Sequence, residues 1–191
     1  MHFLFSLLFF LSVIPASTEI SMLGVKIHDP EKSIAQVKLD QVSKEKNMVK
    51  FKTENGNHFS ITTEKGKVVY MENDWLQHPK GRGALITDFQ FGRTTLKDIR
   101  ARFGTNGYTY KSNAAFTTNT HLVMFNCFEL DSENEEILVT ITKIALNEEV
   151  SEFNVASKLT LDALILADKT YLDKIWGKEK TYDAKRKKVS L

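Results

Sequence analysis

The residues whose types best suit chemistry lie in a short segment near the middle of the chain, His78–Gly83 (HPKGRG). Its two basic side chains and two glycines can present positive charge and backbone amides to an anion or to a protein partner. Just before it, Tyr70 and Trp75 can supply aromatic anchors for a partner, or can simply pack in the core. The segment lacks the GxxxxGK[ST] spacing of a phosphate loop, and a plain exposed connector is the alternative interpretation. The candidate contact residues are therefore Tyr70, Trp75, His78, Lys80 and Arg82.

The histidines and the single cysteine form no pattern typical of catalysis or metal binding. The five histidines are dispersed, with no HExxH motif and no zinc-ligand spacing, so we predict neither a metal site nor a cofactor. A nucleophilic cysteine needs an accessible, electropositive setting, whereas Cys127 lies in the apolar segment FNCFE. We expect a buried thiol that shares its face with Phe125, while Asn126 and Phe128 face the other way. No catalytic residue is predicted.

The N-terminus predicts export. Residues 3–14 form an apolar run, and Pro15, Ala16 and Ser17 follow it, which is the layout of a signal peptide cleaved near Ala16 or Ser17. The run is shorter than the ~20 residues that span a bilayer, so we expect no stable membrane anchor. A buried N-terminal strand or helix is the alternative. One cysteine and no Asn-x-Ser/Thr sequon fit a periplasmic or secreted protein of a bacterial envelope.

Composition narrows the class of protein. The 26 basic and 24 acidic residues leave a net charge of +2, which is too small to indicate a nucleic-acid partner. Thirteen Phe against three Pro favour a packed, sheet-rich core.

The first half of the exported chain is typical of a helix followed by antiparallel strands. Asp29 and Pro30 suit an N-cap and a first helical position, which predicts a helix of two to three turns over Asp29–Leu39. Alternating apolar and polar residues then predict a meander with one solvated face. Its three strands lie around Val49–Phe51, Phe59–Ile61 and Val68–Met71, with turns at Asn55-Gly56 and Lys65-Gly66.

The second half contains the best-specified helix. Thr95 and Asp98 can form a capping box, and Gly104 suits a left-handed C′ position. Leu96, Ile99 and Phe103 share one face of this helix. Strands are predicted over residues 84–91, 107–111, 122–130 and 137–145, a loop over 112–120, and a C-terminal helix over 161–176 from its 3.6-residue period. A frayed basic tail follows.

The fold class that these elements predict is α+β, with antiparallel β-meanders packed with short helices and a C-terminal helix. The halves are either two tandem α-β-β repeats or two unrelated parts of one domain. The expected organisation is a signal peptide at 1–17, a helix-plus-meander unit at 18–83, a helix-plus-hairpin unit with the C-terminal helix at 84–177, and a basic tail at 178–191.

One stretch resembles a known family. Phe91-Gly92-x-Thr94-Thr95-x-x-Asp98-Ile99 with Phe103-Gly104 resembles the helix pattern of the tandem-repeat β-lactamase-inhibitor-protein-like fold and of its single-repeat relatives among small bacterial outer-membrane assembly lipoproteins. Leu23-Gly24 and the segment after it match more loosely. The chain departs from the lipoproteins in lacking a lipid-bearing cysteine, and from the inhibitor in lacking the cysteines that staple its repeats. The resemblance implies non-enzymatic protein binding.

We therefore expect an exported, non-enzymatic protein that binds another envelope or secreted protein through a sheet face or the His78–Gly83 segment. Two alternatives come from other classes. One is an envelope hydrolase or isomerase whose site is assembled in space from scattered histidines and carboxylates. The other is a carrier of a small apolar ligand in a sheet–helix cavity, suggested by the abundance of Phe.

Overall fold

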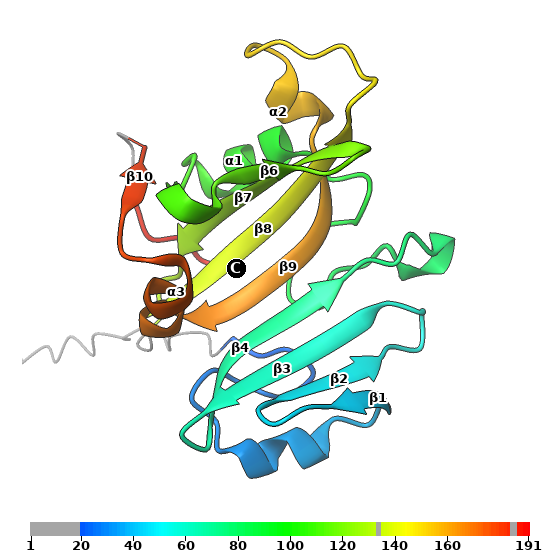
Figure 1. The fold of residues 1–191 in the computed structure, drawn as a ribbon, viewed down its shortest axis with the longest axis vertical. Helices are drawn as coiled ribbons and strands as arrows, with labels where there is room; N and C mark the ends of the chain where they lie inside the picture. Colours follow the sequence, from blue (N-terminus) through cyan, green and yellow to red (C-terminus); the bar gives the residue numbers. More distant parts are fainter. Residues whose placement is uncertain (1–19, 133–134, 184–186) are drawn as a thin grey trace, which may run out of the picture.

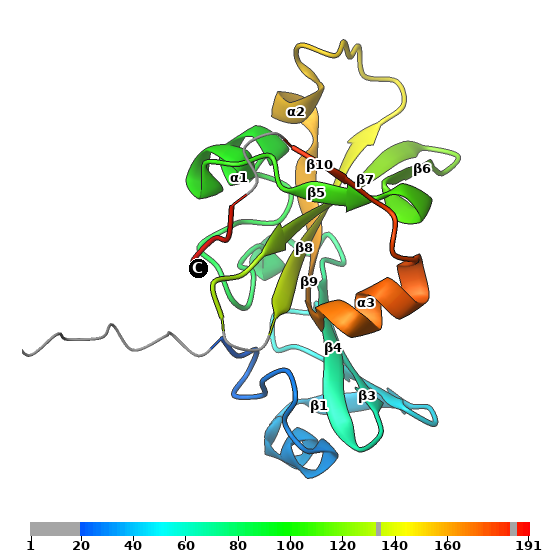
Figure 2. The ribbon, with the colours of Figure 1, turned by 90° about the vertical axis from the view of Figure 1, so that its left-hand side faces the viewer.

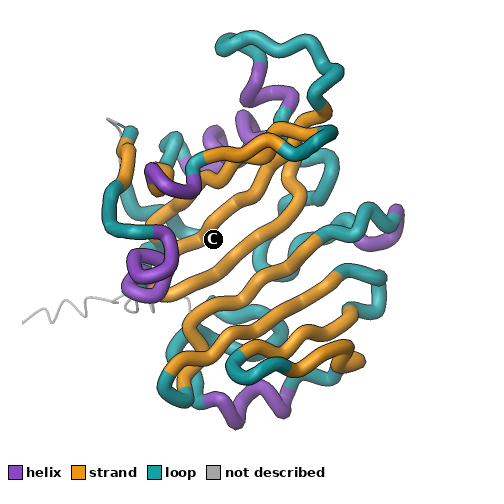
Figure 3. The backbone as a smooth tube through the Cα atoms, in the orientation of Figure 1, coloured by secondary structure: helices purple, strands orange, loops and turns teal. Residues whose placement is uncertain are grey.

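The protein is built around one antiparallel sheet of ten strands with a few short helices (Figures 1 and 3). The computed structural model describes residues 20–132, 135–183 and 187–191, so the predicted signal peptide lies outside the described residues. The sheet dominates, which makes the fold mainly β and only loosely α+β. The strands are β1 (Asp40–Lys44), β2 (Met48–Lys52), β3 (His58–Glu64), β4 (Lys67–Asp74), β5 (Tyr108–Tyr110), β6 (Ala115–Thr117), β7 (His121–Glu129), β8 (Glu136–Ala145), β9 (Thr160–Asp168) and β10 (Lys180–Tyr182). The helices are α1 (Leu96–Phe103), α2 (Val155–Lys158) and α3 (Lys169–Trp176), with 3₁₀ turns η1 (Glu31–Gln36), η2 (Pro79–Gly81) and η3 (Lys111–Asn113).

The two halves of the chain share this sheet. Its strand order is β1-β2-β3-β4-β9-β8-β7-β5-β10, with β6 paired to β7. The junction is the antiparallel pair β4–β9, in which Tyr70 lies opposite Ala167 and Asp74 opposite Ala163. The sheet is therefore continuous from β1 to β10, with β4 and β9 near its middle (Figure 1).

Each face of the sheet has its own apolar cluster. We call the face turned toward the viewer in Figure 1 the front face and the opposite one the back face. The back-face cluster includes Phe59, Met71, Phe103, Phe128 and Leu164, and η1 and α1 lie on this side. The front-face cluster includes Tyr110, Phe125, Cys127, Ile165 and Leu172, and α3 covers it (Figure 2).

The predicted meander is confirmed, with β4 running to Asp74. Lys65 and Gly66 form a two-residue hairpin turn in which both have positive φ, 51° and 75°. Asn55-Gly56 instead lies in the longer loop between β2 and β3, where Thr53 N donates to Asn57 O over 2.9 Å.

The predicted helix over Asp29–Leu39 is wrong in type and extent. The structure has the six-residue 3₁₀ turn η1, with Pro30 at its N-cap, and β1 follows at the sheet edge. Asp29 does not cap a helix, because its Oδ2 accepts from Lys26 N over 2.9 Å and so closes the preceding turn. Glu31 N donates to Gly66 O over 2.9 Å, which fastens the segment to the β3–β4 turn.

Helix α1 is confirmed together with its ends. Thr95 Oγ1 accepts from Asp98 N over 3.2 Å and Asp98 Oδ2 accepts from Thr95 N over 2.9 Å, which completes the capping box. Gly104 ends the helix at a φ of 63°. The three predicted apolar residues, Leu96, Ile99 and Phe103, are buried.

The predicted helix over 161–176 is half wrong, because Thr160–Asp168 is strand β9 and only Lys169–Trp176 is helical. A central strand buried on both faces shows no polar–apolar alternation. Its continuous apolar run therefore also fits the 3.6-residue period of a helix, which is why the prediction was wrong there. Residues 84–91 form no named strand; Gly83 and Gln90 make an isolated bridge. The strands predicted over 107–111, 122–130 and 137–145 are confirmed as β5, β7 and β8.

The segments predicted as a loop and as a frayed tail contain regular structure. The region 112–120 includes most of η3 and the strand β6, which pairs with β7. In the tail, β10 pairs with β5, and the side chain of Val189 is buried in the back-face cluster. Backbone pairing and apolar burial thus hold parts of the tail on the sheet.

Candidate functional site

The front face of β4 carries three polar side chains in a row, which we call the carboxyl row: Tyr70, Glu72 and Asp74. Side chains two residues apart on a strand share a face. Glu72 lies opposite Ile165 in the β4–β9 ladder, and Ile165 belongs to the front-face cluster. The row therefore points to the front, while Met71 packs in the back-face cluster.

Hydrogen bonding and burial link the members of the row. The Tyr70 hydroxyl donates to Glu72 Oε2 over 2.8 Å, and its ring meets that of Tyr171 on α3 edge to face at 6.0 Å. Burial raises the pKa of Glu72 to about 7, and the negative charge of Asp74 contributes to this rise. Burial also raises the pKa of Asp74. The two carboxyl groups therefore hold a proton close to neutral pH.

Basic side chains lie near the row without forming ion pairs with it. Lys50 lies opposite Ser60, which in turn lies opposite Glu72, so Lys50 shares the front face two strands away. The charges of Lys50 and His58 both act to lower the pKa of Asp74, but burial outweighs them. Among the ion pairs of the residues that the structure describes, none includes Glu72 or Asp74.

A second group of side chains surrounds Trp75, directly after β4. The Trp75 ring stacks on Phe91, with centroids 6.4 Å apart and planes at 9°. The guanidinium carbon of Arg82 lies 5.1 Å from the centroid of the Trp75 ring, and Lys143 Nζ lies 5.9 Å from it. Lys143 is paired with Asp162 over 2.5 Å. We call these five residues the Trp75 corner.

The basic loop that follows is held by its own hydrogen bonds. His78 Nδ1 accepts from Lys80 N over 3.4 Å, and His78 O accepts from Gly81 N over 2.9 Å. Arg82 Nη1 donates to Phe91 O over 3.1 Å. These amides and the guanidinium are therefore engaged within the protein, while the side chains of His78 and Lys80 are exposed.

The structure thus divides the five residues predicted to form a contact site. It brings Trp75, His78 and Arg82 together, since Trp75 Nε1 also donates to His78 O over 3.3 Å. Lys80 belongs to the same loop, whereas Tyr70 lies apart on β4. The sequence prediction missed Glu72 and Asp74, because it ended the strand at Met71. The continued alternation Tyr70, Glu72, Asp74 was the signal that could have found them.

A histidine meets a carboxylate elsewhere. His28 Nε2 lies 2.8 Å from Asp168 Oδ2, and Asp168 Oδ1 accepts from Tyr171 N over 2.7 Å as the N-cap of α3. The His28 side chain is 38% exposed, so this pair lies at the surface and not at the bottom of a deep pocket. The part of the chain that the structure describes contains no group of three His, Cys, Asp or Glu residues suited to a metal ion.

Cys127 is buried, as predicted, and shares its cluster with Phe125, while Phe128 lies in the cluster of the opposite face. Burial raises the pKa of its thiol. A thiol that stays protonated is a poor nucleophile.

Comparison with known proteins leaves the family open. No protein-family model, no curated protein and no solved structure matches this chain. The resemblance to the β-lactamase-inhibitor-protein-like fold therefore stays a prediction. Within the described residues, no helix is both long and apolar enough to cross a membrane.

Proposed function

We propose that this chain is an exported, non-enzymatic protein that binds another protein through the part of its front face that carries the carboxyl row. Export rests on the apolar run at 3–14 and the small residues after it. A helical element followed by strands occurs twice along the chain, as η1 with β1–β4 and as α1 with β5–β9. This order supports a tandem arrangement of the kind that the sequence resemblance implies.

The observation that carries the proposal is the carboxyl pair Glu72–Asp74, which is half-buried and has no ion-pair partner among the described residues. Both residues lie on β4, which no described helix crosses from the front (Figure 1). The ionised form of two adjoining carboxyl groups with raised pKa values is stabilised when a cation approaches. A lysine or arginine of a partner would displace the shared proton and form charge-assisted hydrogen bonds. Tyr70 and Tyr171 border this position and provide aromatic contact area.

The partner expected from this chemistry presents a basic residue on an extended or flat surface. Because binding favours the ionised pair, the affinity should rise with pH through about 7, the pKa of Glu72. Added salt should weaken binding, since the contact is electrostatic.

The test is affinity capture from an envelope extract of the native host with three forms of the mature chain. We expect the wild type and the control E54Q/D88N, which neutralises two exposed carboxylates, to retain the same partner. The variant E72Q/D74N should lose it at pH 8. Recovery of no reproducible partner by the wild type, or equal retention by both variants, would count against the proposal. N-terminal sequencing of this chain, purified from the envelope of the native host after expression of the full sequence, tests cleavage near Ala16 or Ser17.

The alternative function is an envelope hydrolase or isomerase in which the same carboxyl pair, with His58 nearby, transfers protons. The raised pKa of Glu72 is the observation that favours it, because a general acid–base group works best with a pKa near the operating pH. Hydrolytic activity on ester or glycoside panels that disappears in E72Q would support this reading over protein binding.

A further inference from the structure

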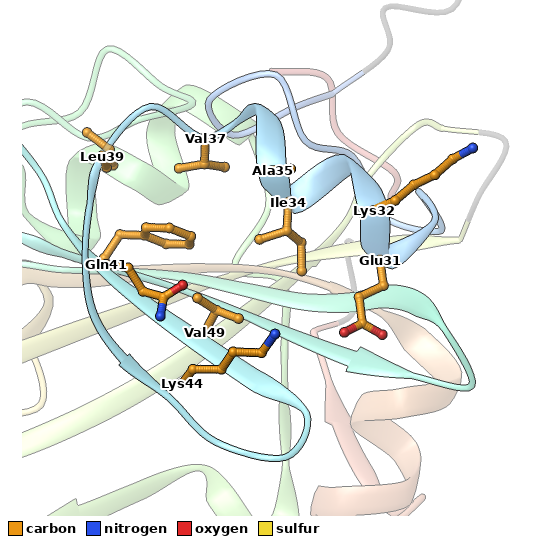
Figure 4. Close-up of a pocket in the computed structure, with 10 residues that line it drawn as sticks. Glu31, Lys32, Ile34, Ala35, Val37, Leu39, Gln41, Lys44 and Val49 are labelled. Carbon is orange, nitrogen blue, oxygen red and sulfur yellow. The ribbon is translucent and has the colours of Figure 1, made fainter.

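A groove lies on the back face at the sheet edge, between η1 and the strands β1 and β2 (Figure 4). Its volume is about 700 Å³, which is within the range of small-molecule sites in proteins. Its apolar lining consists of Ile34, Ala35, Val37, Leu39, Val49 and Phe51. The part of a ligand that lies against these side chains must therefore be apolar, because they offer no hydrogen-bonding group.

The groove exists because η1 is short. After six residues the chain leaves the 3₁₀ turn, and Val37 is already extended with a ψ of 107°. The backbone then arches over the sheet to β1, whose pairing with β2 is irregular between Gln41 and Ser43 (Figure 4). Phe51 and Val49 line the groove from β2 and are 4% and 8% exposed, and the half-buried Ile34 and Leu39 leave apolar surface for a ligand to cover.

The mouth of the groove is charged asymmetrically. Lys44 and Gln41 come from β1, and Figure 4 shows the Lys44 ammonium extending below Ile34, with Val49 between it and the Gln41 amide. Glu31 lies on the opposite, η1 side, and Lys32 points away from the groove. No ion pair of the described residues involves Lys44 or Glu31. A negative group is therefore attracted to the β1 side and repelled from the η1 side.

We propose that this groove binds a linear amphiphile with an apolar tail and a carboxylate head, the chemical class of the fatty acids. The tail lies between η1 and β2 against Val37, Val49 and Phe51. The carboxylate reaches Lys44 Nζ at the mouth. This site is on the face opposite the carboxyl row, so it is independent of the proposed protein-binding surface.

The test uses sodium dodecanoate below its micellar concentration, titrated into the mature chain and followed by methyl NMR and calorimetry. We expect saturable binding with shifts concentrated at the methyl groups of Ile34, Val37 and Val49. Shortening the probe by two methylenes should weaken binding roughly tenfold. Dodecyltrimethylammonium, with the same tail and the opposite charge, should bind more weakly than dodecanoate.

Three variants separate the tail contact from the head contact. Replacing Lys44 in K44Q should weaken dodecanoate binding about threefold to fivefold, the effect of one exposed ion pair. K46Q, in the exposed turn after β1, is the matched control and should bind like the wild type. A35W places a large ring at an exposed lining position and should abolish binding without lowering the melting temperature.

Two results would overturn the fatty-acid site. Absence of saturable shifts, or equal binding by wild type and a folded A35W, would show that the groove takes no acyl chain. Equal affinities for dodecanoate and dodecyltrimethylammonium, or no effect of K44Q, would show that the head is not recognised as a carboxylate. Shifts of the same methyl groups caused by an apolar peptide but not by dodecanoate would also contradict the proposal.

Discussion

Lys180 places its ammonium nitrogen 2.6 Å from Oδ1 of Asp173, and only 5% of the Lys180 side chain is exposed. The same nitrogen lies 4.8 Å from the ring centroid of Tyr110 and 5.6 Å from that of Tyr108. Tyr110 also donates its hydroxyl to Asp173 Oδ1 over 2.7 Å. Because Lys180 is in β10, Asp173 in α3 and Tyr110 in β5, this ion pair ties three elements together on the front face.

We predict that K180M lowers the free energy of unfolding by about 2–4 kcal/mol, since it leaves Asp173 without its cation and removes the contacts with both tyrosine rings. Burial alone would raise the pKa of Asp173, but the hydrogen bonds from Lys180 and Tyr110 outweigh it and lower that pKa. The stabilisation is therefore present above the ordinary pKa of Asp and is lost as pH falls through the lowered value. Urea denaturation between pH 3 and 7 measures both effects, and K180M should flatten the acid side of the curve.

The matched control is K111M, which breaks the ion pair Lys111–Glu179. That pair spans 3.0 Å with side chains 61% and 80% exposed. Exposed pairs contribute about 0–1 kcal/mol, so K111M should change stability far less than K180M. Equal losses in the two variants would contradict the role given to burial of Lys180.

The raised pKa of Glu72 predicts that stability depends on pH in the direction opposite to that expected from Asp173. Its pKa is about 7 in the folded protein against 4.5 ordinarily, so the folded state binds more protons than the unfolded state between these values. Stability from this group is present below the unfolded pKa and falls as pH rises through about 7. E72Q removes this loss and can keep hydrogen bonds to Tyr70 and Asp74. After allowance for solvent screening, we expect E72Q to be more stable than wild type at pH 8 by about 1–2 kcal/mol.

The measurement is thermal or urea unfolding of wild type and E72Q at pH 5 and pH 8. The difference should be present at pH 8 and small at pH 5. E54Q removes an exposed carboxylate from the loop after β2 and should follow the wild type at both values. A wild type that is no less stable at pH 8 than E72Q would show that the Glu72 carboxylate is well solvated.

Elements specified by short-range signals could be predicted from the sequence. Helix α1 carries its capping box and its Gly104 terminator within ten residues, and the structure has both. The turn at Lys65-Gly66 likewise needs only two residues in the left-handed region. The face of the sheet to which Cys127 points could be predicted because successive side chains of a strand point to opposite faces, and here each face has its own apolar cluster.

Elements specified by distant contacts could not be predicted from the sequence. Residues 160–168 are a strand because β4 and β8 pair with them on either side, and nothing local distinguishes their apolar run from a buried helix. Strand β1 exists by pairing with β2 at the edge, where its five residues are exposed and show no alternation. The carboxyl row depends on the same β4–β9 junction, since burial beside β9 gives Glu72 its raised pKa. Only Tyr70 of that row was therefore among the predicted contact residues.

Gly92 tests the packing of the Trp75 corner. Its φ is 66°, and a β-carbon at this position would lie 2.3 Å from Cη2 of Trp75 and 3.0 Å from Nη1 of Arg82. G92A must therefore move the indole off Phe91, in addition to straining the backbone. We expect it to cost about 2–4 kcal/mol and to change the fluorescence of Trp75, measured in a W176F background.

Gly66 provides the matched comparison for that substitution, because its φ of 75° carries the same backbone strain while no heavy atom lies within 4 Å of an added β-carbon. G66A should cost about 1–2 kcal/mol, the penalty of a left-handed alanine, and should leave the Trp75 fluorescence unchanged. The difference between the two variants isolates the steric contribution of the indole. If G92A and G66A are equally destabilising and neither changes the fluorescence, Trp75 does not occupy the position against Gly92 on which the corner depends. A larger loss in G92A with a shifted emission maximum would instead show that close approach of backbone and indole requires glycine there.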